Sequence, residues 1–227
     1  AVGQINPVVG DISCNVRKMS ELIERAKGES ADLIVFPELS VVGYPPKDLL
    51  LRPEMPQKVE RCLTEIIKPL SQGIGIIVGA PVTEVLQKHL YNSALFYYGG
   101  SLMGRQDKTL LPNYDVFDEK RYFSEASCRR LLVFNGLKIG ITICEDAWND
   151  KDYWGEVRYG LDPVQELAAK GADIIVNIAA SPYDYGKRKL RASMLSAIAG
   201  KYGKTVVYVN QVGGNDELIF DGSSLVL

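Results

Sequence analysis

The sequence predicts a single α/β domain built on mixed β-sheet, and three observations lead to this prediction. Segments with the pattern of strands alternate with segments with the pattern of amphipathic helices along almost the whole chain. Continuous apolar runs, such as Ile-Ile-Val at residues 174–176, indicate strands that are buried on both faces, as in parallel sheet. The dipeptides Gly-Gly at 99–100 and Asn-Gly at 135–136 are typical of antiparallel hairpin turns.

The sequence of the first half of the chain predicts three strands, two helices and a hairpin. Asn15 is the expected N-cap of the first helix, and Pro81 is expected to end the third strand. A loop rich in proline and glycine separates the second strand from the second helix. The predicted elements are strands at 2–5, 32–36 and 75–79, helices at 15–27 and 55–70, and a hairpin of 90–98 with 101–105.

The second half continues the alternation after another hairpin. A final antiparallel pair is expected to close the chain, and the Gly-Gly-Asn-Asp segment at 213–216 is predicted to be a turn and not a phosphate-binding loop. The predicted elements are hairpin strands at 131–134 and 138–144, helices at 163–170 and 187–202, strands at 173–178 and 205–210, and the closing pair 218–220 and 223–227.

The composition excludes several classes of protein. The chain has 227 residues, of which 46% are hydrophobic, so it can bury one sizeable core. The formal net charge is −2, which gives no electrostatic basis for binding nucleic acid or an anionic membrane. Apolar runs stay far below the ~20 residues that span a bilayer, and no signal-peptide pattern opens the sequence. We therefore expect a cytoplasmic protein.

The counts of cysteine and histidine restrict the possible chemistry. Cys14, Cys62, Cys128 and Cys144 are scattered without metal-ligand spacing, so we expect reduced thiols. The single histidine, His89, precludes a histidine-rich metal site, and no metal is expected. His89 is interpreted as a structural or surface residue.

Three segments place a reactive side chain after a buried strand or in a loop. They are FPE at 36–38, QDKTLLPNY at 106–114 and GITICED at 140–146. Together they supply a carboxylate, an ammonium group and a thiol. A carboxylate can deprotonate a thiol, the thiolate can attack a carbonyl, and the ammonium can stabilise the oxyanion, so acyl transfer is possible without histidine.

Each of these residues also has an ordinary interpretation. A cysteine after an apolar strand is usually a small core residue, and a lone lysine is usually exposed. Glu119 lies in the charged run Asp-Glu-Lys-Arg at 118–121, which is typical of a solvated surface. Only the combination of the segments favours catalysis.

That combination resembles a known family. FPELSVVGYPPKDLL, DKTLLPNYDVFDEKRYF and GITICEDAW resemble, in this order, the three signature regions of the nitrilase superfamily of carbon-nitrogen hydrolases. The resemblance extends over essentially the whole chain. More narrowly, GYPPKDLL, LPNYDVFDEKRYF, ASPYDYGKR and NQVGGNDELIFDG resemble the glutaminase domain of glutamine-dependent NAD synthetases.

The resemblance implies a four-layer α-β-β-α sandwich with a Glu-Lys-Cys catalytic set. Carried over to this sequence, Glu38 is the general base, Lys108 stabilises the oxyanion and Cys144 is the nucleophile. Glu119 corresponds to a second glutamate that orients the lysine and the substrate amide. Trp148 and Trp154 are expected to pack or to close the loop after the nucleophile.

The resemblance also implies a glutamine site. Tyr44 and Tyr114 match tyrosines that line the glutamine pocket. Glu145, Ser181 and Arg188 match segments that hold the amino-acid head group.

The implied reaction is hydrolysis of L-glutamine through a cysteine thioester, without metal or cofactor. Residues 1–227 would form the hydrolase domain, and its ammonia would pass to a synthetase domain of the same full-length chain, which uses ATP and Mg to amidate deamido-NAD. The resemblance also implies a homo-oligomer. Two alternatives stay open, a stand-alone amidase that acts on another small amide and a catalytically inactive binding module.

Overall fold

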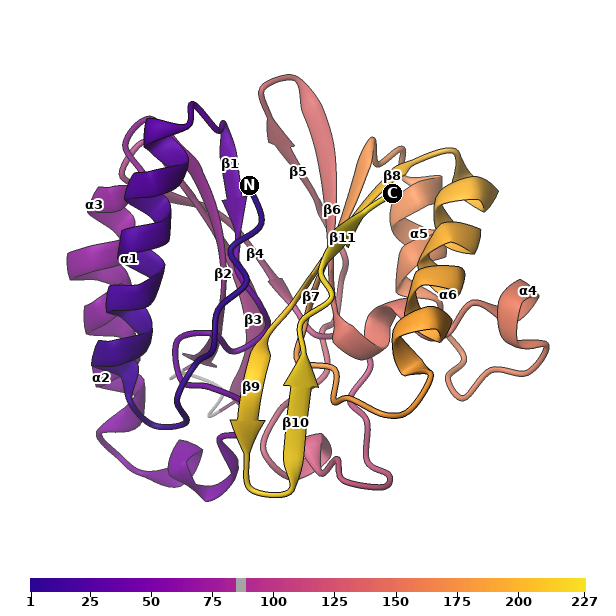
Figure 1. Cartoon of the computed structure of the whole chain (residues 1–227), viewed down its shortest axis with the longest axis horizontal. Coiled ribbons are helices and arrows are strands. Elements are labelled where there is room, and N and C mark those ends of the chain that lie inside the picture. The colour runs from indigo at the N-terminus through magenta and orange to yellow at the C-terminus, as the bar shows by residue number, and fades with distance from the viewer. Residues whose placement is uncertain (85–88) are drawn as a thin grey trace.

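Two β-sheets packed face to face form the centre of the molecule (Figure 1), a computed structural model that describes residues 1–84 and 89–227. Helices cover the outer face of each sheet, so the layers follow the order helix, sheet, sheet, helix. This arrangement confirms the four-layer sandwich. Both sheets contain parallel and antiparallel pairs, so the mixed strand pattern belongs to two sheets and not to one.

The first sheet has the strand order β1-β2-β3-β4, in which only β1 and β2 are parallel. The apolar stripe of α1, which includes Val16, Met19 and Ile23, is buried as the spacing predicts. The helical stretch 55–70 is continuous, with one π-helical segment in its middle. The elements are β1 (Leu33–Val35), β2 (Gly75–Glu84), β3 (His89–Tyr98), β4 (Ser101–Asp107), α1 (Ile12–Gly28), α2 (Met55–Cys62), η2 (Leu63–Ile67) and α3 (Lys68–Leu70).

The second sheet has the strand order β11-β8-β7-β6-β5, and its three central strands are parallel. A separate hairpin of β9 and β10 lies beside it. The elements are β5 (Leu131–Phe134), β6 (Leu137–Ile143), α4 (Lys151–Trp154), α5 (Pro163–Ala169), β7 (Ile174–Ala179), α6 (Lys187–Tyr202), β8 (Thr205–Asn210), β9 (Val212–Asn215), β10 (Leu218–Asp221) and β11 (Leu225–Val226). Three short 3-10 helices are η1 (Lys47–Leu51), η3 (Glu119–Arg121) and η4 (Cys144–Ala147).

Apolar side chains from both sheets fill the interface between them. Ile77 and Phe96 of the first sheet belong to the same buried cluster as Ile141 and Val176 of the second. The rings of Phe96 and Phe134 meet edge to face with centroids 5.3 Å apart. This packing fixes the relative position of the two sheets. Within the two described ranges, no helix combines the length and the apolar character that crossing a membrane requires.

Two local predictions in the first half of the chain are wrong. Asp11, not Asn15, caps the first helix, and its carboxylate accepts the backbone N–H of Cys14. Asn15 lies inside the helix, where its buried amide donates to the carbonyls of Val8 and Val41. Pro81 does not end β2, because β1 pairs with β2 only up to Ile77 and a residue without N–H is tolerated where a strand has one neighbour.

The strand predictions at the two ends of the chain are also wrong in part. In the segment 2–5 only Val2 forms a bridge, with Val35. The last two strands do not pair with each other, because β10 pairs with β9 and β11 pairs with β8. Gly213 lies within β9 and not in a turn, and a Cβ there would lie 2.0 Å from the Oδ1 atom of Asn6. Its φ of 118° requires this glycine, because a residue with a side chain is strained there, although Gly213 lies in a strand and not in a turn.

Candidate active site

The three chemically active segments converge at the ends of strands from different sheets. Glu38 follows β1 and Lys108 follows β4 in the first sheet, while Cys144 directly follows β6 in the second. The turn that carries Glu38 lies against β2 at Gly79, where an added Cβ would lie 2.4 Å from the carbonyl oxygen of Pro37. The site therefore lies at the junction of the two sheets.

Glu38, Lys108 and Glu119 form a buried charge cluster. The Nζ atom of Lys108 lies 2.7 Å from Glu38 Oε1 and 2.7 Å from Glu119 Oε1. None of the three side chains is more than 5% exposed. Tyr44 donates its hydroxyl hydrogen bond to Glu119 Oε1 over 2.9 Å. Two carboxylates and one ammonium group leave the cluster with a formal charge of −1.

Two further groups fix the Glu38 carboxylate, and the sequence analysis identified neither. Asn92 on β3 donates to Oε1 over 2.7 Å, and the backbone N–H of Ala180 donates to Oε2 over 2.9 Å. The signal for Asn92 was available, because Asn92 and Ser93 interrupt an otherwise apolar buried strand. Ala180 gave no signal, since it acts through its backbone.

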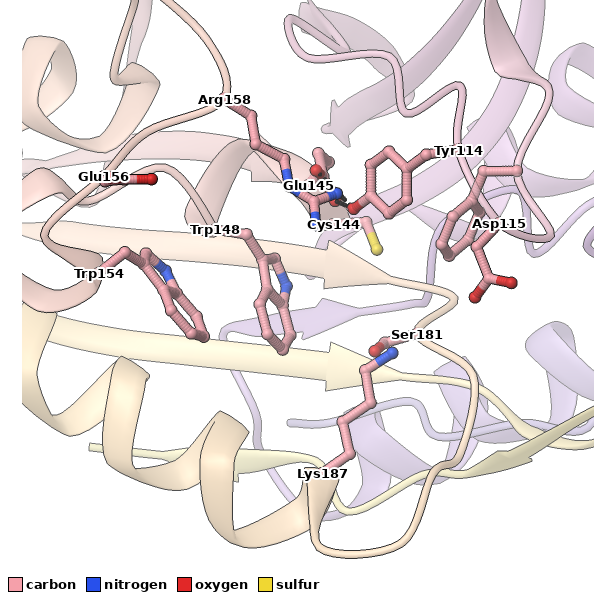
Figure 2. Close-up of a pocket in the computed structure, with 11 residues that line it drawn as sticks. Tyr114, Asp115, Cys144, Glu145, Trp148, Trp154, Glu156, Arg158, Ser181 and Lys187 are labelled. Atoms are coloured by element: carbon pink, nitrogen blue, oxygen red, sulfur yellow. Dashed lines mark hydrogen bonds between the residues drawn. The ribbon is translucent and has the colours of Figure 1, made fainter.

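Cys144 has a strained backbone and faces a cavity. Its φ of 45° lies in the left-handed region, which a residue with a side chain adopts uncommonly. The sulfur points into the cavity beside Tyr114 in Figure 2. Burial and the negative charge of Glu38 raise the pKa of the Cys144 thiol well above its usual range, although Lys108 acts in the opposite direction. The resting thiol is therefore protonated and needs a base.

The charges of the cluster determine its protonation. Burial lowers the pKa of Lys108, but Glu119 and Glu38 outweigh this effect and hold the pKa well above its usual value. Burial raises the pKa of Glu119 to about 7, against the lowering effect of Lys108. At neutral pH the lysine thus carries its charge, whereas the Glu119 carboxyl group is close to the midpoint of its titration.

Asp146 connects the segment of the lysine to the segment of the cysteine. Its Oδ1 accepts the backbone N–H groups of Thr109 and Leu110 over 3.1 and 2.7 Å, and its Oδ2 accepts that of Ile143 over 2.9 Å. Burial raises the pKa of Asp146 to about 7, while these three donors lower it. One buried carboxylate thus joins the segment that carries Lys108 to the segment that carries Cys144.

A cavity of about 350 Å³ opens in front of Cys144 (Figure 2). The indole rings of Trp148 and Trp154 stack with centroids 5.8 Å apart on one side, and the guanidinium of Arg158 lies 4.0 Å from the ring centroid of Tyr114 on another. Acidic, basic and aromatic side chains all face this space. The lining residues are Tyr114, Asp115, Phe117, Cys144, Glu145, Trp148, Trp154, Glu156, Arg158, Ser181 and Lys187.

Three of the five predicted glutamine-binding residues line this cavity. Tyr114 and Glu145 are hydrogen-bonded to each other, with the hydroxyl 2.8 and 2.9 Å from the two carboxylate oxygens. Ser181 also lines the cavity, and its backbone N–H is held by the Asn210 side chain. Tyr44 lies behind the cavity, against Glu119.

The structure does not bring Arg188 to the cavity. Its neighbour Lys187, the first residue of α6, lines the cavity instead, and Arg188 is exposed. Consecutive residues of a helix point about 100° apart, so only one of the two can face the site. The sequence run Lys-Arg-Lys could not show which residue this is.

The remaining sequence-based interpretations concern histidine, the other cysteines and metals. His89 lies on the surface, where its Nδ1 atom is 2.7 Å from the Ser124 hydroxyl. All four cysteines, which lie in described parts of the chain, are free thiols. Over residues 1–84 and 89–227, no three His, Cys, Asp or Glu side chains are grouped so that they could hold a metal ion.

Comparison with known proteins identifies a family and several relatives. The family model described as carbon-nitrogen hydrolase matches residues 1–227. The glutamine-dependent NAD(+) synthetase of Synechocystis sp. is 42% identical over 100% of this chain and 42% of its own length. The protein of the same name from Acinetobacter baylyi is 38% identical over 100% of this chain and 39% of its own length. The chain thus spans about two fifths of the length of these relatives.

Solved structures with the same architecture include two kinds of enzyme. The glutamine-dependent NAD+ synthetase of Acinetobacter baumannii, in complex with ADP, superposes with a TM-score of 0.90 at 38% identity, over 99% of this chain and 40% of that one. An amidase from Nesterenkonia sp. superposes with a TM-score of 0.84 at 22% identity, over 99% of this chain and 80% of that one. The second likeness concerns the fold alone.

Proposed function

Because this chain belongs to the carbon-nitrogen hydrolase family, we propose that it hydrolyses the side-chain amide of L-glutamine through a thioester on Cys144. One observation carries this proposal. The Cys144 thiol faces an amino-acid-sized cavity, and the charges of Glu38 and Lys108 act on it from behind. A base, a cation and a nucleophile are thus available at one place.

In the proposed reaction, Glu38 takes the thiol proton as the sulfur of Cys144 attacks the carboxamide carbon. Lys108 and a backbone N–H after Cys144 stabilise the tetrahedral oxyanion. The C–N bond then breaks, and Glu38 returns the proton to the departing ammonia. A water molecule, deprotonated by Glu38, cleaves the thioester and releases glutamate, with the proton passing back to the Cys144 sulfur.

Glu119 has a free acceptor that suits this substrate. Its Oε1 is hydrogen-bonded to Lys108 and Tyr44, whereas its buried Oε2 has no partner among the described residues. A buried acceptor without a partner is costly, and the N–H of a bound carboxamide would satisfy it. We therefore assign Glu119 two tasks, holding Lys108 and orienting the amide.

The charges that line the cavity favour a zwitterionic substrate. We assign the Glu145 carboxylate, which accepts hydrogen bonds from Tyr114, to the substrate ammonium group. Lys187 and Ser181 are assigned to the substrate carboxylate, with Lys187 taking the part that the sequence suggested for Arg188. A neutral small amide, the substrate of the alternative stand-alone amidase, would leave these charges unused.

The names of the relatives suggest how the ammonia is used. We propose that a synthetase domain of the same full-length chain consumes it to amidate deamido-NAD, with ATP and Mg bound to that domain. The hydrolytic half needs no cofactor in this scheme. We further propose a cytoplasmic location, where reduced thiols persist, and a homo-oligomeric assembly.

The proposal is tested by incubating the protein with L-glutamine and measuring ammonia, while mass spectrometry searches the Cys144 peptide for a glutamyl adduct. Cys144→Ala should abolish both signals. Cys128→Ala, which removes an exposed thiol that does not line the cavity, should leave both unchanged. Ammonia release by Cys144→Ala at the wild-type rate would disprove the mechanism, and faster hydrolysis of neutral amides than of glutamine would favour the stand-alone amidase.

A further inference from the structure

The segment 155–161, which follows α4, forms one wall of the cavity through Glu156 and Arg158. The buried side chain of Asn149 holds this segment. Its Nδ2 donates to the carbonyls of Tyr159 and Leu161 over 2.9 and 2.8 Å, and its Oδ1 accepts the N–H groups of Arg158 and Tyr159 over 3.1 and 3.3 Å. An amide five residues after the nucleophile thus fixes the backbone of this wall.

Tyr159 connects this wall to Glu145. Its hydroxyl donates to Glu145 Oε1 over 3.1 Å, and the same carboxylate accepts the hydroxyl of Tyr114. Burial and the Glu145 charge raise the pKa of Tyr159 above its usual range, so the hydroxyl remains a donor. Two tyrosines from different segments therefore hold one carboxylate in a single orientation.

The Glu145 carboxylate forms no ion pair in the part of the chain that the structure describes. Arg158, which lines the same cavity, stacks on the ring of Tyr114 instead. Neither a lysine nor an arginine of residues 1–84 and 89–227 forms an ion pair with it, although Glu145 is only 6% exposed. A buried carboxylate with two neutral donors is incompletely compensated, and a bound ammonium group would complete it. The orientation that the two tyrosines impose then decides where that ammonium binds.

We propose that Tyr159 is a positioning residue that orients Glu145 and so makes the site selective for amides with a free α-ammonium group. The inference rests on the proposed glutaminase function. Tyr114 and Cys144 belong to the second and third of the three reactive segments, whereas Tyr159 reaches the site from a separate exposed loop. Selectivity is thereby set in part by a segment that contributes nothing to the chemical step.

The test compares two substrates that differ only at the group in question. L-Glutamine carries the α-ammonium, and 4-carbamoylbutanoate has the same carboxamide and carboxylate but lacks it. Tyr159→Phe should lower kcat/KM for glutamine about 10-fold, mainly through KM, because one hydrogen bond to a charged group is lost. For 4-carbamoylbutanoate kcat/KM should change less than about 2-fold. Equal losses on both substrates, or no loss on either, would overturn the proposal.

Tyr153→Phe is a matched control. Tyr153 lies on α4, six residues earlier, and its hydroxyl bonds to Ser193 outside the cavity lining. The same chemical change there should leave the ratio of the two kcat/KM values as in the wild type. Thermal unfolding of both variants separates loss of selectivity from loss of folding.

A binding measurement makes the test independent of turnover. In the Cys144→Ala background, calorimetry should show that Tyr159→Phe weakens glutamine binding about 10-fold and leaves 4-carbamoylbutanoate binding unchanged. If the wild-type protein releases no ammonia from glutamine, the proposed function fails. If it does release ammonia but the two substrates respond alike to Tyr159→Phe, only the role of Tyr159 fails.

Discussion

The buried charge cluster and the mouth of the cavity both contain acidic and basic side chains, but these are buried in the cluster and exposed at the mouth. In the cluster, Lys108 is held between Glu38 and Glu119 at 2.7 Å from each. At the mouth, Glu156 and Arg158 are exposed and come from a loop. Glu38 and Lys108 follow strands of the first sheet and Glu119 begins η3, so the cluster joins distant parts of the chain, while Glu156 and Arg158 belong to one local segment.

This difference indicates what stabilises the charges in each region. Charges in the cluster have lost their hydration, so each depends on its partners, and removal of one partner affects folding as well as chemistry. Charges at the mouth keep most of their water, so their loss should affect only the ligand that they contact. The predictions below test this contrast.

The largest effect is expected for Lys108→Met. The change removes the proposed oxyanion donor, which should lower kcat roughly 10²- to 10³-fold. It also leaves Glu38 and Glu119 facing each other without a cation, so the free energy of unfolding should fall by about 3–5 kcal/mol. Steady-state kinetics and urea unfolding measure the two effects. Full stability of this variant would show that the cluster is not held by its ion pairs.

The second prediction concerns Glu119→Gln and pH. The folded-state pKa of Glu119, about 7, lies above its ordinary value of 4.5, so the folded protein binds a proton that the unfolded chain has already released. The stabilisation from this proton is complete below pH 4.5 and is lost as pH rises through 7. Wild-type stability relative to Glu119→Gln should therefore fall by up to about 3 kcal/mol between pH 4.5 and pH 8. Urea unfolding at both pH values checks this, and a constant difference would refute it.

The smallest effect is expected at Lys187, a charged residue of α6 that lines the cavity. Lys187→Met should raise KM for glutamine about 10-fold, because a charged contact to the substrate carboxylate is lost. Stability should change by less than about 0.5 kcal/mol, since the side chain is partly solvated. Arg188→Met, one position along the same helix, should alter neither KM nor stability. If Arg188→Met raised KM instead, the assignment of the carboxylate site would be reversed.

The same contrast explains what the sequence could predict. Glu38, Lys108 and Cys144 could be predicted because each lies in a contiguous sequence motif that resembles a family signature. Burial alone would not have identified Lys108, because the strand that precedes it is largely exposed. The sequence marks Asn92 only as a polar residue in a buried strand and does not mark Ala180 at all. Their contacts with Glu38 arise only when β3 and the segment after β7 pack against the turn that carries Glu38. Tyr159 depends on the path of an irregular loop.

The errors in the fold that the sequence predicted have similar causes. Proline locally favours the end of a strand, and glycine locally favours a turn. At Pro81 and Gly213 the contacts with the rest of the molecule place both residues within strands instead. The pairing of β10 with β9 and of β11 with β8 also depends on neighbours far from the local pattern. Helix α6, by contrast, begins and ends at the predicted residues because a glycine in the left-handed region flanks each end, Gly186 and Gly203.

The two oxygens of Glu38 are tied to different halves of the molecule. Oε1 is held by Lys108 and Asn92 of the first sheet, and Oε2 is held by the N–H of Ala180, which follows β7 of the second. If one sheet slides against the other by a fraction of an ångström, the Ala180 bond must stretch or the carboxylate must rotate away from Lys108. The proposed general base is therefore sensitive to the alignment of the two sheets, and any reaction that depends on Glu38 should slow when the sheets shift against each other.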